Sequence, residues 1–336
     1  MSYHILFLTR ASNLRRVALP LSLATLAACD DATPTRTELT APTPVPAFAR
    51  GGSGDNNGRI LFASTRDDPA AFEIYSMNPD GTGVSRLTNS PGHDMSPAWS
   101  PDGKRVAFVS VRHDPDGEIY VMNADGTGVS RLTYSAGVDG SPAWSKDGKR
   151  IAFVSMRGDP AGDIYIMNDD GTGVTPVTDF DGLDRDPAWS PDGKQIAFVS
   201  SRDALGAGTS DLYVLTLDGR QVDRLTVMAV NVHDPSWAPG GKQLAFHFSF
   251  DPGDADILTT GVFVVSADGT LLSRLTDGPG DGGQESAPSW SPDGKFIAFQ
   301  SIRDGDVDIY VMNADGTGLS RLTTSPAEDV TPAWNR

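Results

Sequence analysis

A carboxylate recurs at one fixed distance before a tryptophan in five places along the chain. It lies five residues before the tryptophan each time, as Asp94, Asp139, Asp184, Glu285 and Asp329. Before a sixth tryptophan, Trp237, the same position holds Val232. Carboxylates brought together in a ring can bind a cation such as Ca²⁺, or a basic peptide. The first hypothesis is therefore an acidic ligand ring.

An arginine accompanies each of these acids and supports a second hypothesis. The arginines each follow a short apolar run, and they are Arg66, Arg112, Arg157, Arg202 and Arg303. The next apolar run begins with another acid, as Glu73, Glu118, Asp163, Asp211 and Asp308. If these segments are adjacent strands, each arginine lies between two acids of its own repeat and ties the strands together. One repeat lacks all three charges, with Val232, Phe250 and Gly261 in their places. This joint loss favours the structural cluster over the ligand ring.

The single cysteine, Cys29, lies in a different chemical setting. Arg15-Arg16 is followed by an apolar run over residues 17–28, which is too short to cross a bilayer and has the charge order of a secretory signal. Residues 26–29 read Leu-Ala-Ala-Cys and resemble the bacterial lipobox, in which the cysteine becomes the lipid-modified first residue. We therefore expect lipidation at Cys29, and a plain signal peptide is the alternative.

Patterns typical of enzymes are scarce. The five histidines show no metal-ligand pairing, and one cysteine excludes a cysteine-based zinc site. Residues 278–283 match the residue pattern of a dinucleotide-binding motif, Gly-x-Gly-x-x-Gly. The match has no functional meaning, because no strand–turn–helix unit surrounds these residues. No Gly-x-Ser-x-Gly motif occurs. We expect no catalytic residue and no cofactor, with calcium on the acid ring as the one alternative.

The charge of the chain restricts its partners. It holds 27 Lys and Arg against 44 Asp and Glu, a net charge of -17. Residues 1–28 contain three arginines and no acid, so the remainder carries 24 - 44 = -20. Such a polyanion is repelled by nucleic-acid phosphates and by anionic lipid headgroups. We expect no nucleic-acid partner, and membrane contact only through a lipid anchor.

The elements that must position these residues come from one phrase repeated six times. The six tryptophans are spaced 45, 45, 48, 53 and 44 residues apart, and each lies two residues after a proline. The phrase Trp-Ser-Pro-Asp-Gly-Lys leads into alternating or β-branched runs separated by Asp-Gly turns, which are typical of hairpins. We name the four short strands of a repeat A (ending at the tryptophan), B, C and D. Four antiparallel strands per repeat make one blade of a β-propeller.

The register of the repeat predicts how the ring closes. The first strand, Arg59–Ser64, matches strand B, and the last segment, Thr331–Arg336, matches strand A. Six blades are complete only if this last strand pairs into the first blade, which also removes two exposed sheet edges. The predicted fold is all-β, a closed six-bladed propeller of four-stranded antiparallel blades over residues 59–336. A lipoprotein signal peptide over residues 1–28 and a Thr/Pro/Gly-rich tether over residues 29–58 precede it.

The repeated phrase resembles the WD40-like repeat (PD40 type) of the TolB propeller family. It consists of Trp-Ser-Pro-Asp-Gly-Lys, an apolar strand and an Asn-x-Asp-Gly turn, as in residues 99–126. The resemblance covers about Arg59 to Arg336. It implies a protein of the bacterial cell envelope, and the lipobox at Cys29 adds a lipid anchor on its periplasmic or surface face. The implied partner is an envelope protein or peptide, with a peptidoglycan-associated lipoprotein as the family's example. Members of the TolB type carry an added N-terminal α/β domain, for which residues 30–58 leave no room, so a member without that domain is expected.

Two functional hypotheses remain. The first is a monomeric binding or scaffold module that recognises a protein, peptide or glycan through the face bearing the B–C and D–A loops. On that face the B–C loops of two neighbouring blades, over residues 203–210 and 251–260, are the longest. The alternative is a carbohydrate-active or lyase-type enzyme with an acidic site at the channel mouth, with or without a metal.

Overall fold

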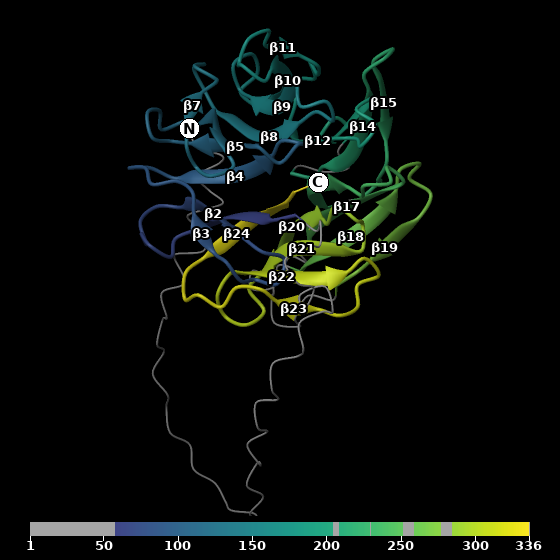
Figure 1. The fold of residues 1–336 in the computed structure, drawn as a ribbon. Helices are drawn as coiled ribbons and strands as arrows, with labels where there is room; N and C mark the ends of the chain where they lie inside the picture. The colour runs from purple at the N-terminus through teal and green to yellow at the C-terminus, as the bar shows by residue number, and fades with distance from the viewer. Residues whose placement is uncertain (1–57, 204–207, 229, 251–258, 277–283, 336) are drawn as a thin grey trace, which may run out of the picture. The chain divides into compact units, whose positions relative to one another are not determined.

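A computed structural model describes residues 58–203, 208–228, 230–250, 259–276 and 284–335 (Figure 1). The predicted signal peptide, the tether and Cys29 lie outside these residues, as do most of the two long B–C loops. Within the described part of the chain, no helix is long and apolar enough to cross a bilayer. The described residues form 24 strands in six four-stranded sheets.

The blades follow one another along the chain. Blade one contains β24 (Asp329–Trp334), β1 (Ile60–Ser64), β2 (Glu73–Met77) and β3 (Ser85–Arg86). Blade two contains β4 (Asp94–Trp99), β5 (Arg105–Ser110), β6 (Glu118–Asn123) and β7 (Ser130–Arg131). Blade three contains β8 (Asp139–Trp144), β9 (Arg150–Ser155), β10 (Asp163–Asn168) and β11 (Thr175–Pro176).

The second half of the ring has the same order. Blade four contains β12 (Asp184–Trp189), β13 (Gln195–Ser200), β14 (Asp211–Thr216) and β15 (Gln221–Arg224). Blade five contains β16 (Asn231–Trp237), β17 (Gln243–Phe250), β18 (Thr259–Ser266) and β19 (Leu272–Arg274). Blade six contains β20 (Glu285–Trp290), β21 (Phe296–Ser301), β22 (Asp308–Asn313) and β23 (Ser320–Arg321). Strands B and C of blade five are longer than expected, and strand D is shorter than the predicted Arg-Leu-Thr run in most blades.

The ring is closed by the last strand, as predicted. Strand β24 pairs antiparallel with β1, with Trp334 opposite Ile60 and Asp329 opposite Ser64. The six A strands contact one another in the cyclic order β4, β8, β12, β16, β20, β24 and back to β4. They are therefore the innermost strands of the propeller and surround its central channel.

Every A strand contains a bulge at its proline. The residue before the proline has a positive φ between 48° and 53°, and it is Ser96, Ser141, Asp186, Asp234, Ala287 or Thr331. Proline lacks an N–H donor and restricts the residue before it, so the ladder to strand B shifts register at this point. The bulge leaves one non-glycine residue per blade in a strained conformation at the channel.

Five of the tryptophans, Trp144, Trp189, Trp237, Trp290 and Trp334, pack into the blade that precedes their own. Trp144 of blade three joins an apolar cluster with Ala107 of blade two, and Arg105 of blade two stacks 4.6 Å from its ring centroid. Trp334 of blade one is buried in the same way against Ala298 of blade six. Because the tryptophan belongs to one sheet and its pocket to another, this contact joins neighbouring blades.

Candidate functional site

The five predicted ring acids begin the A strands and are fully buried. We call them the inner acids. Each forms an ion pair with the arginine predicted for its blade: Arg66–Asp329 at 2.8 Å, Arg112–Asp94 at 2.7 Å, Arg157–Asp139 at 2.7 Å, Arg202–Asp184 at 2.8 Å, and Arg303–Glu285. The guanidinium groups also lie against aromatic rings of strands B and C, as Arg112 does at 5.0 Å from the Tyr120 ring centroid. The inner acids are thus held inside their blades and do not line the channel.

The acids that begin the C strands, here called the outer acids, have a different partner from the expected one. Strand D supplies a second arginine, which binds the outer acid in the pairs Arg86–Glu73 at 2.9 Å, Arg131–Glu118 at 2.7 Å, Arg224–Asp211 at 2.5 Å, and Arg321–Asp308. A threonine two residues later donates its hydroxyl to the same carboxylate, as Thr88 does to Glu73 at 2.5 Å. The expectation that one arginine serves both acids is therefore wrong. The inner and the outer acid of a blade pair with different arginines.

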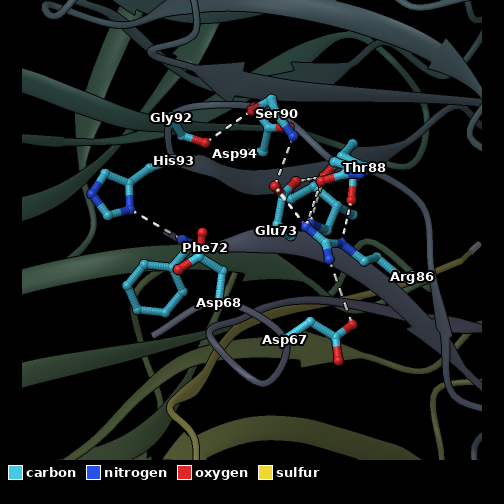
Figure 2. A network of polar contacts seen from close by, with 12 residues as sticks. Asp67, Asp68, Phe72, Glu73, Arg86, Thr88, Ser90, Gly92, His93 and Asp94 are labelled. Atoms are coloured by element: carbon cyan, nitrogen blue, oxygen red, sulfur yellow. Dashed lines mark hydrogen bonds and ion pairs between the residues drawn. The ribbon is translucent and has the colours of Figure 1, made fainter. Parts of the chain in front are cut away.

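Inner and outer acids instead meet across the seam between two blades. The backbone N–H of Asp94 in blade two donates to the carbonyl of Phe72 in blade one at 2.8 Å, which brings Asp94 to the start of strand C of blade one. Figure 2 shows Asp94 near Thr88 and Glu73, with Arg86 on the other side of Glu73. Burial raises the pKa of Asp94, and the Glu73 carboxylate raises it further, against the lowering effect of Ser110 and Arg112. Each such seam is a polar joint between neighbouring blades.

Blade five lacks both kinds of pair but keeps one arginine. Val232 and Phe250 replace the acid and arginine of the inner pair together. Gly261 replaces the outer acid, yet the strand D arginine, Arg274, is retained and donates to the Thr276 carbonyl at 2.6 Å. Blade five therefore lacks the whole inner pair, but of the outer pair it lacks only the acid.

Calcium on the acid ring remains only a hypothesis. The inner acids are buried next to arginines, and no group of three or more His, Cys, Asp or Glu side chains in the described ranges is arranged to hold a metal ion. The arrangement of the predicted site residues favours a structural role.

The channel itself is lined by a different set of residues. On the innermost strands, the positions one and three residues before the tryptophan are partly exposed, and in four of the six strands so is the position four residues before it. Most of these positions hold Ala, Ser, Thr, Met or Val. The charged residues among them are Arg185, Asp186 and Asp234, which lie on the adjacent strands β12 and β16. Charge in the described channel wall is therefore concentrated on blades four and five.

These three residues form a cluster with two histidines of blade five, which we call the channel cluster. Arg185 Nε lies 3.6 Å from Asp186 Oδ2, and the backbone N–H of Asp234 is 3.5 Å from the same oxygen. His247 Nδ1 lies 3.4 Å from Asp234 Oδ2, and the His247 ring stacks on His233 with centroids 4.8 Å apart. Carboxyl, guanidinium and imidazole groups of two blades thus come together at one side of the channel.

The surroundings of the cluster set its charge. Burial, followed by the nearby Arg185, lowers the pKa of His247 to about 3, and both act in the same direction on His233. Desolvation within the cluster raises the pKa of Asp234, and the neighbouring Asp186 carboxylate raises it further. Both imidazoles are neutral at pH 7, and Arg185 and Asp186 present opposite charges side by side. Such a patch can pair with a basic and an acidic group of one ligand.

Sequence reasoning missed this cluster because it followed the position five residues before each tryptophan. An alignment on the tryptophans would have exposed it, since the position three residues before reads Ser, Ser, Asp, Asp, Ala and Thr around the ring. Such an alignment could not predict the contact with His247, because His247 belongs to strand B and reaches Asp234 only in the folded blade.

Comparison with known proteins places the chain among propellers. The model of the TolB beta propeller domain matches residues 37–136, 73–179 and 141–278. A protein TolB homolog of Chlorobium luteolum is 44% identical over 57 residues, 17% of this chain and 13% of that protein. The Tol-Pal system protein TolB of Desulfosudis oleivorans is 40% identical over 62 residues, 18% of this chain and 14% of that protein. The matched segments span 14% or less of the length of these two relatives.

A solved structure extends the likeness over most of the described chain. The crystal structure of TolB from Acinetobacter baumannii superimposes with a TM-score of 0.71 at 27% sequence identity. The match covers 84% of this chain and 67% of that one.

Proposed function

The chain belongs to the TolB beta propeller domain family, and from this membership we propose that it is a binding scaffold of the bacterial cell envelope. The carrying observation is the channel cluster. It lies at the start of the innermost strands, on the face that also bears the B–C and D–A loops. A partner segment that enters the channel from this face meets small uncharged side chains on most sides and the Arg185–Asp186 patch on one side.

The chemistry of the patch selects the kind of partner. A peptide segment with a basic and an acidic side chain pairs with Asp186 and Arg185, and Asp234 adds a second carboxyl group beside them. One relative is named a Tol-Pal system protein, so a peptidoglycan-associated lipoprotein is the first candidate partner. The burial and pairing of the inner acids support a scaffold over an enzyme, because an acid–base catalyst needs carboxyl groups within reach of a substrate.

Crosslinking in intact cell envelopes tests this proposal. We expect the parent chain to capture one envelope protein that the double variant Asp186→Asn, Asp234→Asn no longer captures. Asp218→Asn is the matched control, because it removes an exposed carboxylate from the C–D turn on the opposite face. Equal capture by the parent and the double variant, with both folded by circular dichroism, contradicts the proposal.

The proposed anchor is the lipid-modified Cys29. The support is the Leu-Ala-Ala-Cys end of the apolar run in the sequence. Cys29→Ala should move the protein from the membrane pellet to the soluble envelope fraction. A variant that still pellets with the membranes contradicts lipid anchoring but leaves the channel proposal intact.

A further inference from the structure

One of the six seams between blades differs from the others at its outer end. In five seams, the glycine of a C–D turn packs against the carbonyl of the leucine that directly follows strand D of the preceding blade; the pairs are Gly81–Leu322, Gly126–Leu87, Gly171–Leu132, Gly269–Leu225 and Gly316–Leu275. A Cβ atom at Gly171 would lie 2.7 Å from the Leu132 oxygen, so only glycine fits. A Cβ atom at Gly219, in the C–D turn of blade four, would have nothing within 4 Å. The seam between blades three and four is therefore open at the perimeter.

A crevice of about 290 Å³ occupies this opening. The apolar part of its wall comes from both blades, through Ile166 and Val177 of blade three and Leu215 and Leu217 of blade four. Arg150 and Arg220 also line it, so two guanidinium groups border an apolar surface. A cavity of this kind can take one aliphatic side chain with anionic groups beside it.

Arg150 lacks the acidic partner that Arg105 has in the preceding seam. In the preceding seam, Arg105 lies 4.6 Å from the ring centroid of Trp144 and pairs with Asp169 at 2.7 Å. Arg150 repeats the first contact, at 4.8 Å from the ring centroid of Trp189.

Leu217 occupies the position in blade four that corresponds to Asp169, the acidic partner of Arg105, in blade three. The turn Asn168-Asp169-Asp170-Gly171 corresponds to Thr216-Leu217-Asp218-Gly219. The backbone confirms this match, because the N–H of Asp169 donates to the Lys149 carbonyl and the N–H of Leu217 donates to the Lys194 carbonyl, both at 3.0 Å. Within the described residues, no carboxylate forms an ion pair with Arg150.

We propose that this crevice binds an acidic peptide segment of a partner protein, whose carboxylate takes the place of Asp169 beside Arg150. The neighbouring aliphatic side chain of the segment packs on Leu215 and Val177. Arg220 at the rim forms an ion pair with a second carboxylate of the segment. The polar side chains of Asn168 and Thr175 lie in the same wall and hydrogen-bond to the amide groups of the peptide. In a chain with a large excess of acids, a cation without an acidic partner next to an apolar cavity is a site of charge complementarity. The crevice lies at the C–D turns, on the opposite side from the channel mouth, so it goes beyond the proposed function.

The test uses the full chain with ¹⁵N-labelled tryptophan and the peptide N-acetyl-Glu-Leu-Glu-amide. The indole signal of Trp189, assigned through Trp189→Phe, should shift on titration, because Arg150 stacks on that ring. N-acetyl-Gln-Leu-Gln-amide should bind at least tenfold more weakly, since it has the same shape without the charge. Arg150→Gln should also weaken binding at least tenfold, and glutamine already occupies the corresponding positions 195 and 243.

A matched pair of variants separates charge from shape. Leu217→Asp restores the carboxylate that blade three has, so it should pair with Arg150 internally and abolish binding of the acidic peptide. Leu217→Asn makes the same change of shape without the charge and should keep affinity within about threefold. The proposal is overturned if both peptides bind equally, if the acidic peptide shifts no indole signal at millimolar concentration, or if Leu217→Asp binds like Leu217→Asn. Tighter binding of decanoate than of the acidic peptide also overturns it, in favour of a fatty-acid site.

Discussion

At the scale of single residues, this propeller keeps many carboxylates inside by giving inner and outer acids separate arginines. The inner acid is paired within its own blade, and the outer acid is paired by strand D, with the two carboxylates facing each other across a seam. A buried charge whose partner is removed is costly, because neither water nor a counter-ion replaces the lost contact. Each arginine of this network is therefore a sensitive point for stability.

Arg157→Met tests the inner pair. The change leaves Asp139, which is fully buried, without the guanidinium that now lies 2.7 Å away. We expect the free energy of unfolding in urea to fall by about 3 kcal/mol. Lys194→Met is the control, since Lys194 is exposed at an A–B turn, and it should change stability by less than about 0.5 kcal/mol. Equal losses for the two variants would return the inner acids to the ligand-ring hypothesis.

The histidines of the channel cluster predict a response to acid. The pKa of His247 is about 3 in the folded protein and about 6.5 in an unfolded chain. The unfolded state therefore binds more protons between these values, and the stability that His247 contributes above pH 6.5 is lost as the pH falls toward 3. His247→Phe keeps an aromatic ring next to His233 and removes the titration.

The measurement is urea unfolding at pH 7.5, 6 and 5. Below pH 6.5 the parent should lose up to about 1.4 kcal/mol per pH unit more than His247→Phe. Parallel pH profiles for the parent and His247→Phe would show that His247 is accessible to protons in the folded state.

At the scale of elements, strand D is short but chemically important. It often has only two residues, yet its arginine and the threonine that follows it hold the outer acid of the blade. Blade three is the exception, because β11 has Pro176 where other blades have this arginine. Its outer acid, Asp163, keeps the Thr178 hydroxyl at 3.1 Å. Burial raises the pKa of Asp163, and the Asp184 carboxylate adds to this effect.

Pro176→Arg should repair this strand. Pro176 lies opposite Tyr165, as Arg131 lies opposite Tyr120, so the new guanidinium points at Asp163. We expect a gain of about 1–2 kcal/mol in the free energy of unfolding from a charge-assisted hydrogen bond. Thr175→Arg adds the same charge on the other side of the strand and should give no such gain. A Pro176→Arg variant no more stable than Thr175→Arg would contradict the role given to strand D.

The sequence predicted the parts of this architecture that repeat. It did not predict contacts between residues that are brought together only by the folded structure. Repeated Trp and Asp-Gly positions are enough to place strands A to C and to close the ring. The pairing of Glu73 with Arg86 rather than with Arg66 was not predicted, because strand order within a blade does not say which side of the carboxylate each arginine reaches. The meeting of Asp94 with Glu73 was missed for a related reason, since it joins two blades and no spacing within one repeat encodes it.

At the scale of the whole molecule, the ring depends on a single closing strand. β24 pairs with β1 in blade one, and its Trp334 packs in blade six. Arg66 reaches Asp329 across 263 residues of sequence, so an ion pair also crosses the closure. The closing strand thus joins the two ends of the propeller by backbone pairing, by apolar packing and by charge.

Deletion of Thr331–Arg336 should open the ring. It removes the partners of Ile60 and Leu61 and the buried Trp334, and the loss of a packed tryptophan alone costs about 3–5 kcal/mol. We expect the truncated protein to melt at a much lower temperature or to aggregate, as followed by calorimetry and light scattering. Deletion of six residues from the predicted tether, 36–41, is the control of equal length and should not change melting. A monomeric truncation with the parental melting curve would refute closure by β24.

Closure by the last strand also dictates an order of events during synthesis. Strand β1 is made, and in an exported chain crosses the membrane, before the other blades, yet its inner edge stays unpaired until β24 has followed. During that interval the segment Ile60-Leu61-Phe62-Ala63, which is fully buried in the finished protein, presents an open and apolar strand edge. Blade one is therefore the first to be translated and the last to be completed, and its open strand edge is where an incompletely folded chain is most prone to aggregate.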